Sequence, residues 1–210
     1  LLLLAGEAGI GKTRLAEELT AWVARHGLTT ATARCYPQVT GAALPYAAVA
    51  EWLNDPAFAS RLTDLDDAWL VEVARIAPAL TAGRPHLEPP GPLTEPWQRT
   101  RLFEALARVV LGSAPGRDGL RSPARGEASL HRTQARSSPA LRGGRAPLLL
   151  FLDDLQWVDR ETLDWLDYLL HFDPRAPLLV MGTVRPQEVG KDHPLAPLEL
   201  ALARAGLLSE

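Results

Sequence analysis

The chain has 210 residues, is 47% hydrophobic and carries a formal net charge of only −3. This length is sufficient for one domain with its own core, and the small net charge argues against a global field that attracts nucleic acid or membranes. The only cysteine, Cys35, excludes an internal disulfide and fits a reducing compartment, where it is expected to be a packed core residue. Because the sequence has neither a secretory signal nor an apolar stretch long enough to span a membrane, we expect a cytoplasmic protein without membrane partners.

The chain begins with an apolar run that leads into a glycine-rich loop. Residues 1–4 are all leucine, which is typical of a buried parallel strand, and residues 12–26 predict a helix. The spacing Gly6-x-x-x-x-Gly11-Lys12-Thr13 between them is that of a phosphate-binding loop. The alternative is a glycine-rich turn with an incidental lysine, which the preceding strand and the following helix disfavour. Because the sequence starts inside this run and without methionine, we expect it to be a fragment.

The glycine-rich loop is the predicted nucleotide site. Its backbone N–H groups and the positive end of the following helix both favour a bound phosphate. The Lys12 ammonium is predicted to reach the β- and γ-phosphates, and the Thr13 hydroxyl to bind Mg²⁺. The residues predicted to contact the nucleotide are Gly6, Glu7, Ala8, Gly9, Ile10, Gly11, Lys12, Thr13 and Arg14.

Helical and strand patterns alternate along the next part of the chain. In the first helix, the apolar residues that fall on one face are Leu15, Leu19, Trp22 and Val23. Residues 28–35 are rich in β-formers and predict a second strand. Further helices are predicted at residues 46–54, 66–80 and 95–111, with a proline-rich break before the last of them.

Residues 112–146 differ in composition from the rest of the chain. From residue 113 to 146 there are seven arginines against Asp118 and Glu127, so this segment carries about +5. The favoured interpretation is a disordered insertion that divides the core into residues 1–111 and 147–210. The alternatives are a basic arm for nucleic acid and a segment without selected structure, but the interleaved aromatics expected of a nucleic-acid arm are lacking.

The last part of the chain supplies the predicted second half of the site. Residues 147–152 predict a buried strand that ends at Asp153 and Asp154, and residues 176–184 predict a fourth strand that ends at Arg185. Helices are predicted at residues 160–172 and 199–207, with a loop at 185–197 between the fourth strand and the last helix. Apolar strands separated by helices predict an α/β fold with a parallel sheet and helices on both faces.

Carboxylates that directly follow a parallel strand face the ligand crevice of such a sheet. Asp153 is therefore predicted to hold Mg²⁺ through water, and Asp154 to act as general base toward the attacking water. The alternative for the pair is a helix cap or a solvated turn. Arg185 is predicted to sense the γ-phosphate, and the hydroxyl of Thr183 at the end of the same strand could do so as well; the alternative is a surface arginine. Asn54 is the only asparagine, so the guanine-reading Asn-Lys-x-Asp motif is absent and ATP is favoured over GTP.

Four segments together resemble a known family: GEAGIGKTRL, RCYPQVTGAALPYAAVAEWL, LLLFLDDLQWVDRETLDWL and LLVMGTVRPQE. They are similar to the AAA-type, STAND-class ATPase domains of LuxR-type transcriptional activators and of some bacterial adenylate cyclases and kinases. The resemblance implies a three-layer P-loop NTPase fold, here incomplete at both ends of the chain. It gives Lys12 and Thr13 the Walker A roles, Asp153 and Asp154 the Walker B roles, and Arg185 the sensor position.

By resemblance, ATP and Mg²⁺ are the expected ligands, and the domain is a slowly hydrolysing switch between ADP-bound and ATP-bound forms. The resemblance also implies self-association through this domain and an effector domain, such as a DNA-binding or cyclase domain, on further sequence. The alternatives are a loader- or remodelling-type AAA ATPase, an inactive nucleotide-binding module and a small-molecule kinase.

Overall fold

The computed structural model describes residues 1–37, 44–81, 84, 86–112, 146–190 and 192–209. Within these residues four strands form one sheet, in the order β1-β4-β3-β2. The strands are β1 (Leu2–Ala5), β2 (Thr29–Arg34), β3 (Leu148–Asp153) and β4 (Leu178–Val184), and neighbouring strands pair in parallel. The predicted α/β fold with a parallel sheet is confirmed, whereas the predicted insertion lies outside the described residues except for its two ends, Gly112 and Ala146.

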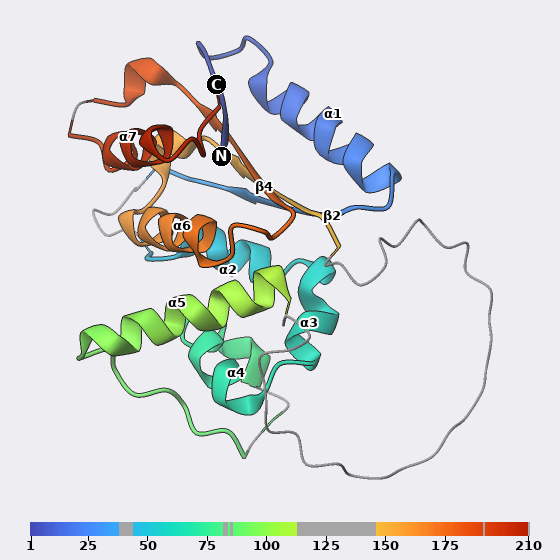
Figure 1. Cartoon of the computed structure of the whole chain (residues 1–210), viewed down its shortest axis with the longest axis vertical. Helices are drawn as coiled ribbons and strands as arrows, with labels where there is room; N and C mark the ends of the chain where they lie inside the picture. Colours follow the sequence, from blue (N-terminus) through green and yellow to red (C-terminus); the bar gives the residue numbers. More distant parts are fainter. Residues whose placement is uncertain (38–43, 82–83, 85, 113–145, 191, 210) are drawn as a thin grey trace.

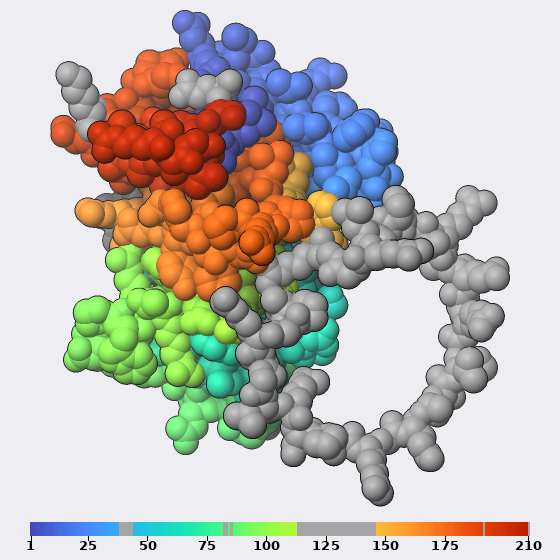
Figure 2. Space-filling view, in the orientation of Figure 1, coloured from blue at the N-terminus to red at the C-terminus, as the bar shows by residue number. Residues whose placement is uncertain are grey.

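Helices cover both faces of the sheet, which gives three layers (Figure 1). The helix α1 (Lys12–Arg25) packs on one face. The larger core on the other face includes side chains of α2 (Ala47–Leu53), α5 (Pro96–Leu111), α6 (Arg160–Phe172) and α7 (Leu195–Arg204). In the space-filling view α6 and α7 form much of the surface that faces the reader (Figure 2). The described helices include none that is both long enough and apolar enough to cross a membrane.

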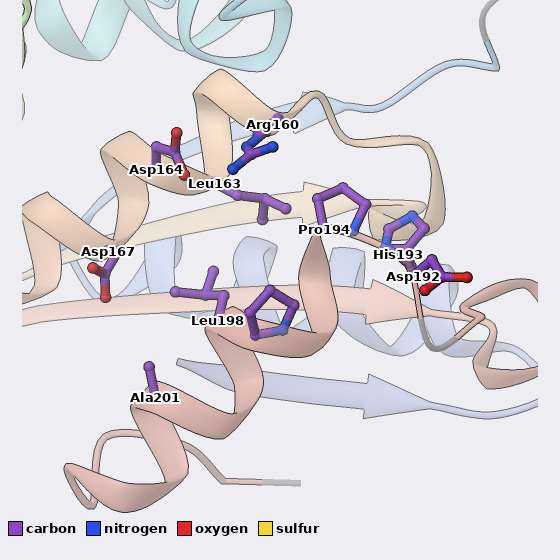
Figure 3. A pocket seen from close by; sticks show the side chains of 10 residues that line it. Arg160, Leu163, Asp164, Asp167, Asp192, His193, Pro194, Leu198 and Ala201 are labelled. Carbon is purple, nitrogen blue, oxygen red and sulfur yellow. The ribbon is translucent and has the colours of Figure 1, made fainter.

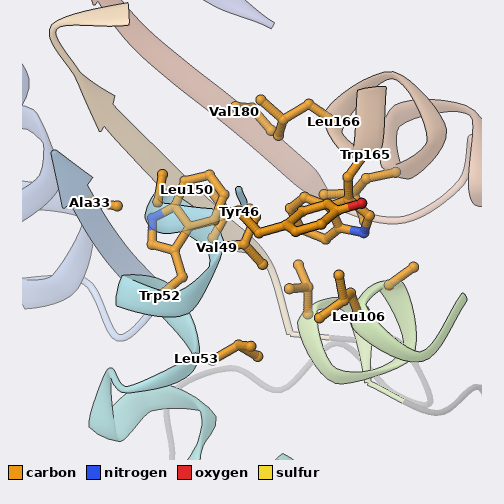
Figure 4. Packing of buried hydrophobic residues seen from close by; sticks show 14 of the residues in the cluster. Ala33, Tyr46, Val49, Trp52, Leu53, Leu106, Leu150, Trp165, Leu166 and Val180 are labelled. Carbon is orange, nitrogen blue, oxygen red and sulfur yellow. The ribbon is translucent and has the colours of Figure 1, made fainter. Parts of the chain in front are cut away.

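Two buried tryptophans join α2, α5 and α6 to the sheet (Figure 4). The Trp52 indole N–H donates to the Phe151 carbonyl of β3 at 3.2 Å, and the Trp165 indole N–H donates to the Phe103 carbonyl of α5 at 3.3 Å. The two ring centroids are 6.3 Å apart. Each ring therefore contributes a large apolar area to the core while its polar atom has a partner, which is the condition for burying tryptophan without a penalty.

Most predicted helices lie within one or two residues of their expected bounds, but two do not. The helix predicted at 66–80 is α4 (Asp67–Val73), followed by turns and the 3₁₀ helix η2 (Pro78–Thr81). Pro78 cannot donate a backbone hydrogen bond and disfavours a helical residue before it, so the helix ends early. The last helix starts at Leu195, inside the predicted loop. Pro197 does not prevent this earlier start, since it falls in the first turn, where a missing N–H costs nothing.

Short elements also occur where none was predicted. They are η1 (Pro56–Phe58), α3 (Ala59–Thr63), η3 (Leu155–Trp157) and η4 (Pro186–Glu188).

The buried face of α1 differs from the predicted apolar face. Ala16 is fully buried against the sheet, with Leu19 and Val23 partly buried beside it, whereas Leu15 is 60% exposed and Trp22 is 51% exposed. The small Ala16 side chain lets the helix approach the sheet closely. The apolar stripe of the helix is therefore wider than its contact with the sheet, and periodicity alone does not say which part of the stripe is buried.

The chain returns to the outer edge of β1 after α7. Ser209 forms an isolated parallel bridge with Leu2, in which the Leu3 N–H donates to the Ser209 carbonyl at 2.9 Å and the Ser209 N–H donates to the Leu1 carbonyl at 2.9 Å. The two ends of the chain therefore lie side by side (Figure 1).

Candidate nucleotide-binding site

The parallel sheet brings the predicted site residues to one edge. Because all four strands run in the same direction, their carboxyl ends meet there. The glycine loop follows β1, Arg34 ends β2, Asp153 ends β3 and Arg185 follows β4. Groups separated by most of the chain length thus converge on one crevice.

The loop presents backbone groups to this crevice. Gly9 and Gly11 have φ values of 79° and 99°, in the region that favours glycine, and Gly11 precedes the first turn of α1. Glycine has no side chain that could cap the helix, so first-turn N–H groups remain for an anion. The Lys12 ammonium donates to the carbonyls of Gly6 and Glu7, at 2.9 and 2.8 Å.

Thr13 and Asp153 meet at the bottom of the crevice, although 140 positions separate them in the sequence. The Thr13 hydroxyl donates to Asp153 Oδ1 at 2.9 Å, and the Thr183 hydroxyl donates to the same oxygen at 2.6 Å. Asp153 is only 3% exposed. A hydroxyl and a carboxylate are hard oxygen donors of the kind that Mg²⁺ prefers, so this pair fits the predicted metal role.

The described residues hold no cluster of three or more His, Cys, Asp or Glu side chains that would form a metal site by itself. An ion between Thr13 and Asp153 would therefore depend on phosphate oxygens and water for its remaining ligands, as Mg²⁺ in nucleotide sites does.

Asp154 is held in place from several sides. Its Oδ1 accepts from the Gln156 amide at 2.8 Å and from Arg185 Nη2 at 3.3 Å, and its Oδ2 accepts from Arg34 Nη2 at 3.0 Å. Its backbone N–H donates to the Thr183 hydroxyl at 2.9 Å. Burial acts to raise the pKa of Asp154, but the bonds from Gln156 and Arg34 and the charge of Arg185 outweigh it, so the pKa lies below its usual value. The carboxylate is therefore ionised at neutral pH.

The backbone of Asp154 is unusual. With φ of 61° it is one of two non-glycine residues with positive φ in the described part of the chain. Such a conformation is unfavourable for a residue with a Cβ and persists where surrounding contacts enforce it, often at functional sites.

Two side chains of this network did not emerge from the sequence as site residues, Arg34 and Gln156. Arg34 could have been found, because it lies one residue before the end of the strand predicted at 28–35, at the edge of the sheet that faces the ligand; the observed strand β2 ends at Arg34 itself. Gln156 gives no such signal. It is 4% exposed, its amide donates to Asp154, and its Oε1 accepts from the Arg185 backbone N–H at 3.3 Å.

A hollow of about 270 Å³ lies over these groups. Its lining residues are Ala8, Gly9, Gly11, Lys12, Thr13, Arg14, Arg34, Asp154 and Arg185. Four cationic side chains thus face one carboxylate, a balance that suits a polyphosphate. Of the other residues predicted to contact nucleotide, Gly6 and Glu7 hold the Lys12 ammonium, and Ile10 is 71% exposed.

A larger hollow, of about 550 Å³, lies between α6 and α7 (Figure 3). Three aspartates line it, Asp164, Asp167 and Asp192, against one arginine, Arg160. This excess of negative charge disfavours a polyphosphate. The hollow at the glycine loop is therefore the better candidate for nucleotide, although it is smaller.

Cys35 follows Arg34 but takes no part in the site chemistry. The side chain is 6% exposed, and burial raises the pKa of its thiol to about 12. A protonated buried thiol is a poor nucleophile, in agreement with the prediction of a packed core residue.

Comparison with known families agrees with this geometry. Residues 1–181 match the family described as AAA ATPase domain. The chain belongs to this family. Membership supports a nucleotide-binding ATPase function for the AAA ATPase domain described here. No curated protein matches the chain.

Proposed function

We propose that this AAA ATPase domain binds ATP with Mg²⁺ at the glycine-loop hollow, hydrolyses it slowly, and serves as a nucleotide switch in a multidomain signalling or transcriptional regulator. The observation that carries the ATP site is the hydrogen bond from the Thr13 hydroxyl to Asp153 Oδ1, at 2.9 Å, beneath a loop with Walker A spacing. Family membership supports the ATPase activity.

The side chains have distinct proposed roles. Lys12 exchanges the carbonyls of Gly6 and Glu7 for β- and γ-phosphate oxygens, and loop N–H groups bind the remaining phosphate oxygens. Asp154 orients the attacking water and accepts its proton, while Arg185 contacts the terminal phosphate. Bound Mg²⁺ would neutralise phosphate charge next to Thr13 and Asp153.

The switch role rests on the likeness of the four motif segments to STAND-class regulators. Self-association and an effector domain on further sequence belong to the same proposal. A loader- or remodelling-type ATPase shares the nucleotide site and would differ in its partner. An inactive nucleotide-binding module would bind ATP without hydrolysing it, which a measurement of ATP turnover by the parent protein tests directly.

Two variants test the site. Lys12→Ala should abolish ATP binding measured by calorimetry, because the principal phosphate cation is lost. Asp154→Asn should bind ATP within about twofold of the parent, yet lose about 10²-fold or more in turnover, the usual contribution of a general base. Circular dichroism checks that both variants fold. If both hydrolyse ATP like the parent protein, the assignment of the site is wrong.

A further inference from the structure

We propose that His193 is a positioning residue for ATP hydrolysis: its imidazole holds the main chain of Gln156, and Gln156 in turn orients the carboxylate of Asp154. The inference rests on the proposed function, in which Asp154 is the general base, and adds a residue outside the nucleotide hollow. His193 precedes α7 and lines the separate hollow between α6 and α7 (Figure 3).

The two nitrogen atoms of the His193 ring have partners of opposite kind. The backbone N–H of Leu195, the first residue of α7, donates to Nδ1 at 3.1 Å. Nε2 lies 3.1 Å from the carbonyl oxygen of Gln156, which can only accept a hydrogen bond. Both contacts are hydrogen bonds at once only in the neutral tautomer that carries its proton on Nε2. The ring therefore joins the start of α7 to η3, 37 positions away in the sequence.

The backbone of His193 is fixed on both sides. Its N–H donates to the Gly190 carbonyl at 3.0 Å, and its carbonyl accepts from the Ala196 N–H at 3.0 Å. The ring thus projects from a turn that is tied to the start of α7. In contrast, η3 is a single 3₁₀ turn of three residues, an element with few hydrogen bonds of its own. A bond from outside the turn therefore has a large share in fixing its position.

Gln156 connects this anchor to the predicted base. Its amide donates to Asp154 Oδ1 at 2.8 Å, and its Oε1 accepts from the Arg185 backbone N–H at 3.3 Å. The residue is 4% exposed, so water has little access to these bonds. The carbonyl of Gln156 is held by His193 and its side-chain oxygen by Arg185. These two bonds aim the amide N–H at Asp154.

The arrangement predicts an effect on turnover and not on nucleotide affinity. Among the described residues, those that line the glycine-loop hollow do not include His193. A general base must lie within hydrogen-bond reach of the attacking water, and a misplacement of about 1 Å can cost ~10²-fold in rate. Loss of the bond from His193 to Gln156 should therefore lower kcat. The KM for ATP should stay nearly constant, since KM reports binding when hydrolysis is slow.

Three substitutions separate the two bonds of His193. His193→Asn keeps an acceptor for the Leu195 N–H, but its shorter side chain does not reach Gln156. His193→Gln places an amide N–H close to the position of Nε2 and keeps a donor for the Gln156 carbonyl, and His193→Ala removes both bonds. For the full chain with Mg²⁺ and ATP, kcat should fall about tenfold in the alanine and asparagine variants and stay within about threefold of the parent in the glutamine variant. The KM should change by less than about twofold in all three.

His171→Ala is the matched control. It removes a histidine whose ring bonds the Asp167 carbonyl of its own helix, α6, and it should change neither kcat nor KM. Circular dichroism checks that all variants fold. Should His193→Ala not fold, the asparagine and glutamine variants carry the comparison.

A second measurement does not depend on activity. The ¹⁵N chemical shifts of the His193 ring, assigned by the signals that His193→Asn removes, should show a neutral ring with its proton on Nε2. A proton on Nδ1 instead would refute the bond to Gln156, because Nε2 would then have nothing to donate.

The kinetic outcomes separate this inference from the proposed function. If the asparagine variant hydrolyses ATP like the parent, or the glutamine variant is as slow as the asparagine variant, the bond to Gln156 does not orient Asp154. The role of His193 is then refuted while the ATPase site stands. A rise in KM at constant kcat refutes it as well. If the parent protein does not hydrolyse ATP, both proposals fail.

Discussion

Thr183 links the two aspartates of the candidate site, the side chain of Asp153 and the backbone of Asp154, through a single hydroxyl group. It donates to Asp153 Oδ1 at 2.6 Å and accepts from the Asp154 backbone N–H at 2.9 Å. The residue is 1% exposed, so water does not replace either bond. One side chain on β4 thereby fixes both the orientation of the predicted metal ligand and the left-handed backbone of the predicted base.

This arrangement predicts the effect of removing the hydroxyl. Thr183→Val keeps the shape but leaves the buried Asp154 N–H without a partner, which should lower the free energy of unfolding by about 1–3 kcal/mol. Urea denaturation measures the change. Thr183→Ser retains the hydroxyl and should lose less. Equal stability of the valine variant and the parent protein would show that the hydrogen bonds of the Thr183 hydroxyl do not stabilise the left-handed backbone at Asp154.

At the scale of elements, Asp159 connects the start of α6 to the start of α2. Its Oδ1 accepts from the Thr162 N–H of α6 at 2.8 Å and from the Tyr46 N–H at 2.9 Å, and its Oδ2 accepts from the Thr162 hydroxyl at 2.7 Å. Tyr46 has φ of 61° and precedes α2. The buried side chain that caps α6 thus also fixes the backbone at the start of α2, more than 100 positions away in the sequence.

Removal of this connection should be costly. Asp159→Ala loses a helix cap and leaves the Tyr46 N–H buried without a partner, so the free energy of unfolding should fall by about 2 kcal/mol or more. Asp159→Asn keeps an acceptor oxygen and should lose less. Asp55→Ala, which removes the cap of the short helix η1, provides a comparison and should cost about 1 kcal/mol or less. If the two alanine variants lose the same stability in thermal unfolding, the link to α2 contributes nothing.

At the scale of the whole molecule, the candidate site joins elements from both ends of the sequence. Its lining comes from the loop after β1, from the first turn of α1, and from residues that end or follow β2, β3 and β4. A ligand that bridges these elements stabilises the folded chain as a unit, because unfolding destroys every part of its site at once.

Nucleotide should therefore raise the unfolding temperature. At a concentration of 100 times its dissociation constant, ATP with Mg²⁺ adds about 2.7 kcal/mol, which corresponds to a rise of about 5–10 °C for a chain of this size. Scanning calorimetry with and without ATP measures the shift, and Lys12→Ala should abolish it. A rise that persists in this variant would place the bound nucleotide outside the glycine-loop hollow.

Local signals in the sequence account for much of the fold. The glycine spacing, the apolar runs of β1 and β3 and the helical stripes of α5 and α6 each depend on residues that are neighbours in the chain, and the structure places these elements close to their predicted bounds. The errors lie where a nonlocal contact decides. Leu15 and Trp22 lie outside the buried face of α1 because the sheet meets Ala16, a contact that no local pattern encodes.

The same division applies to the candidate site. The sequence by itself determined which residues end the strands, and therefore which chemical groups reach the ligand edge of a parallel sheet: the glycine loop, Asp153 and Arg185. Only the tertiary structure decided that Arg34 and Gln156 reach Asp154, and that the Thr13 hydroxyl lies 2.9 Å from Asp153. Strand order and side-chain direction fix these distances, and both arise from the packing of segments far apart in the sequence.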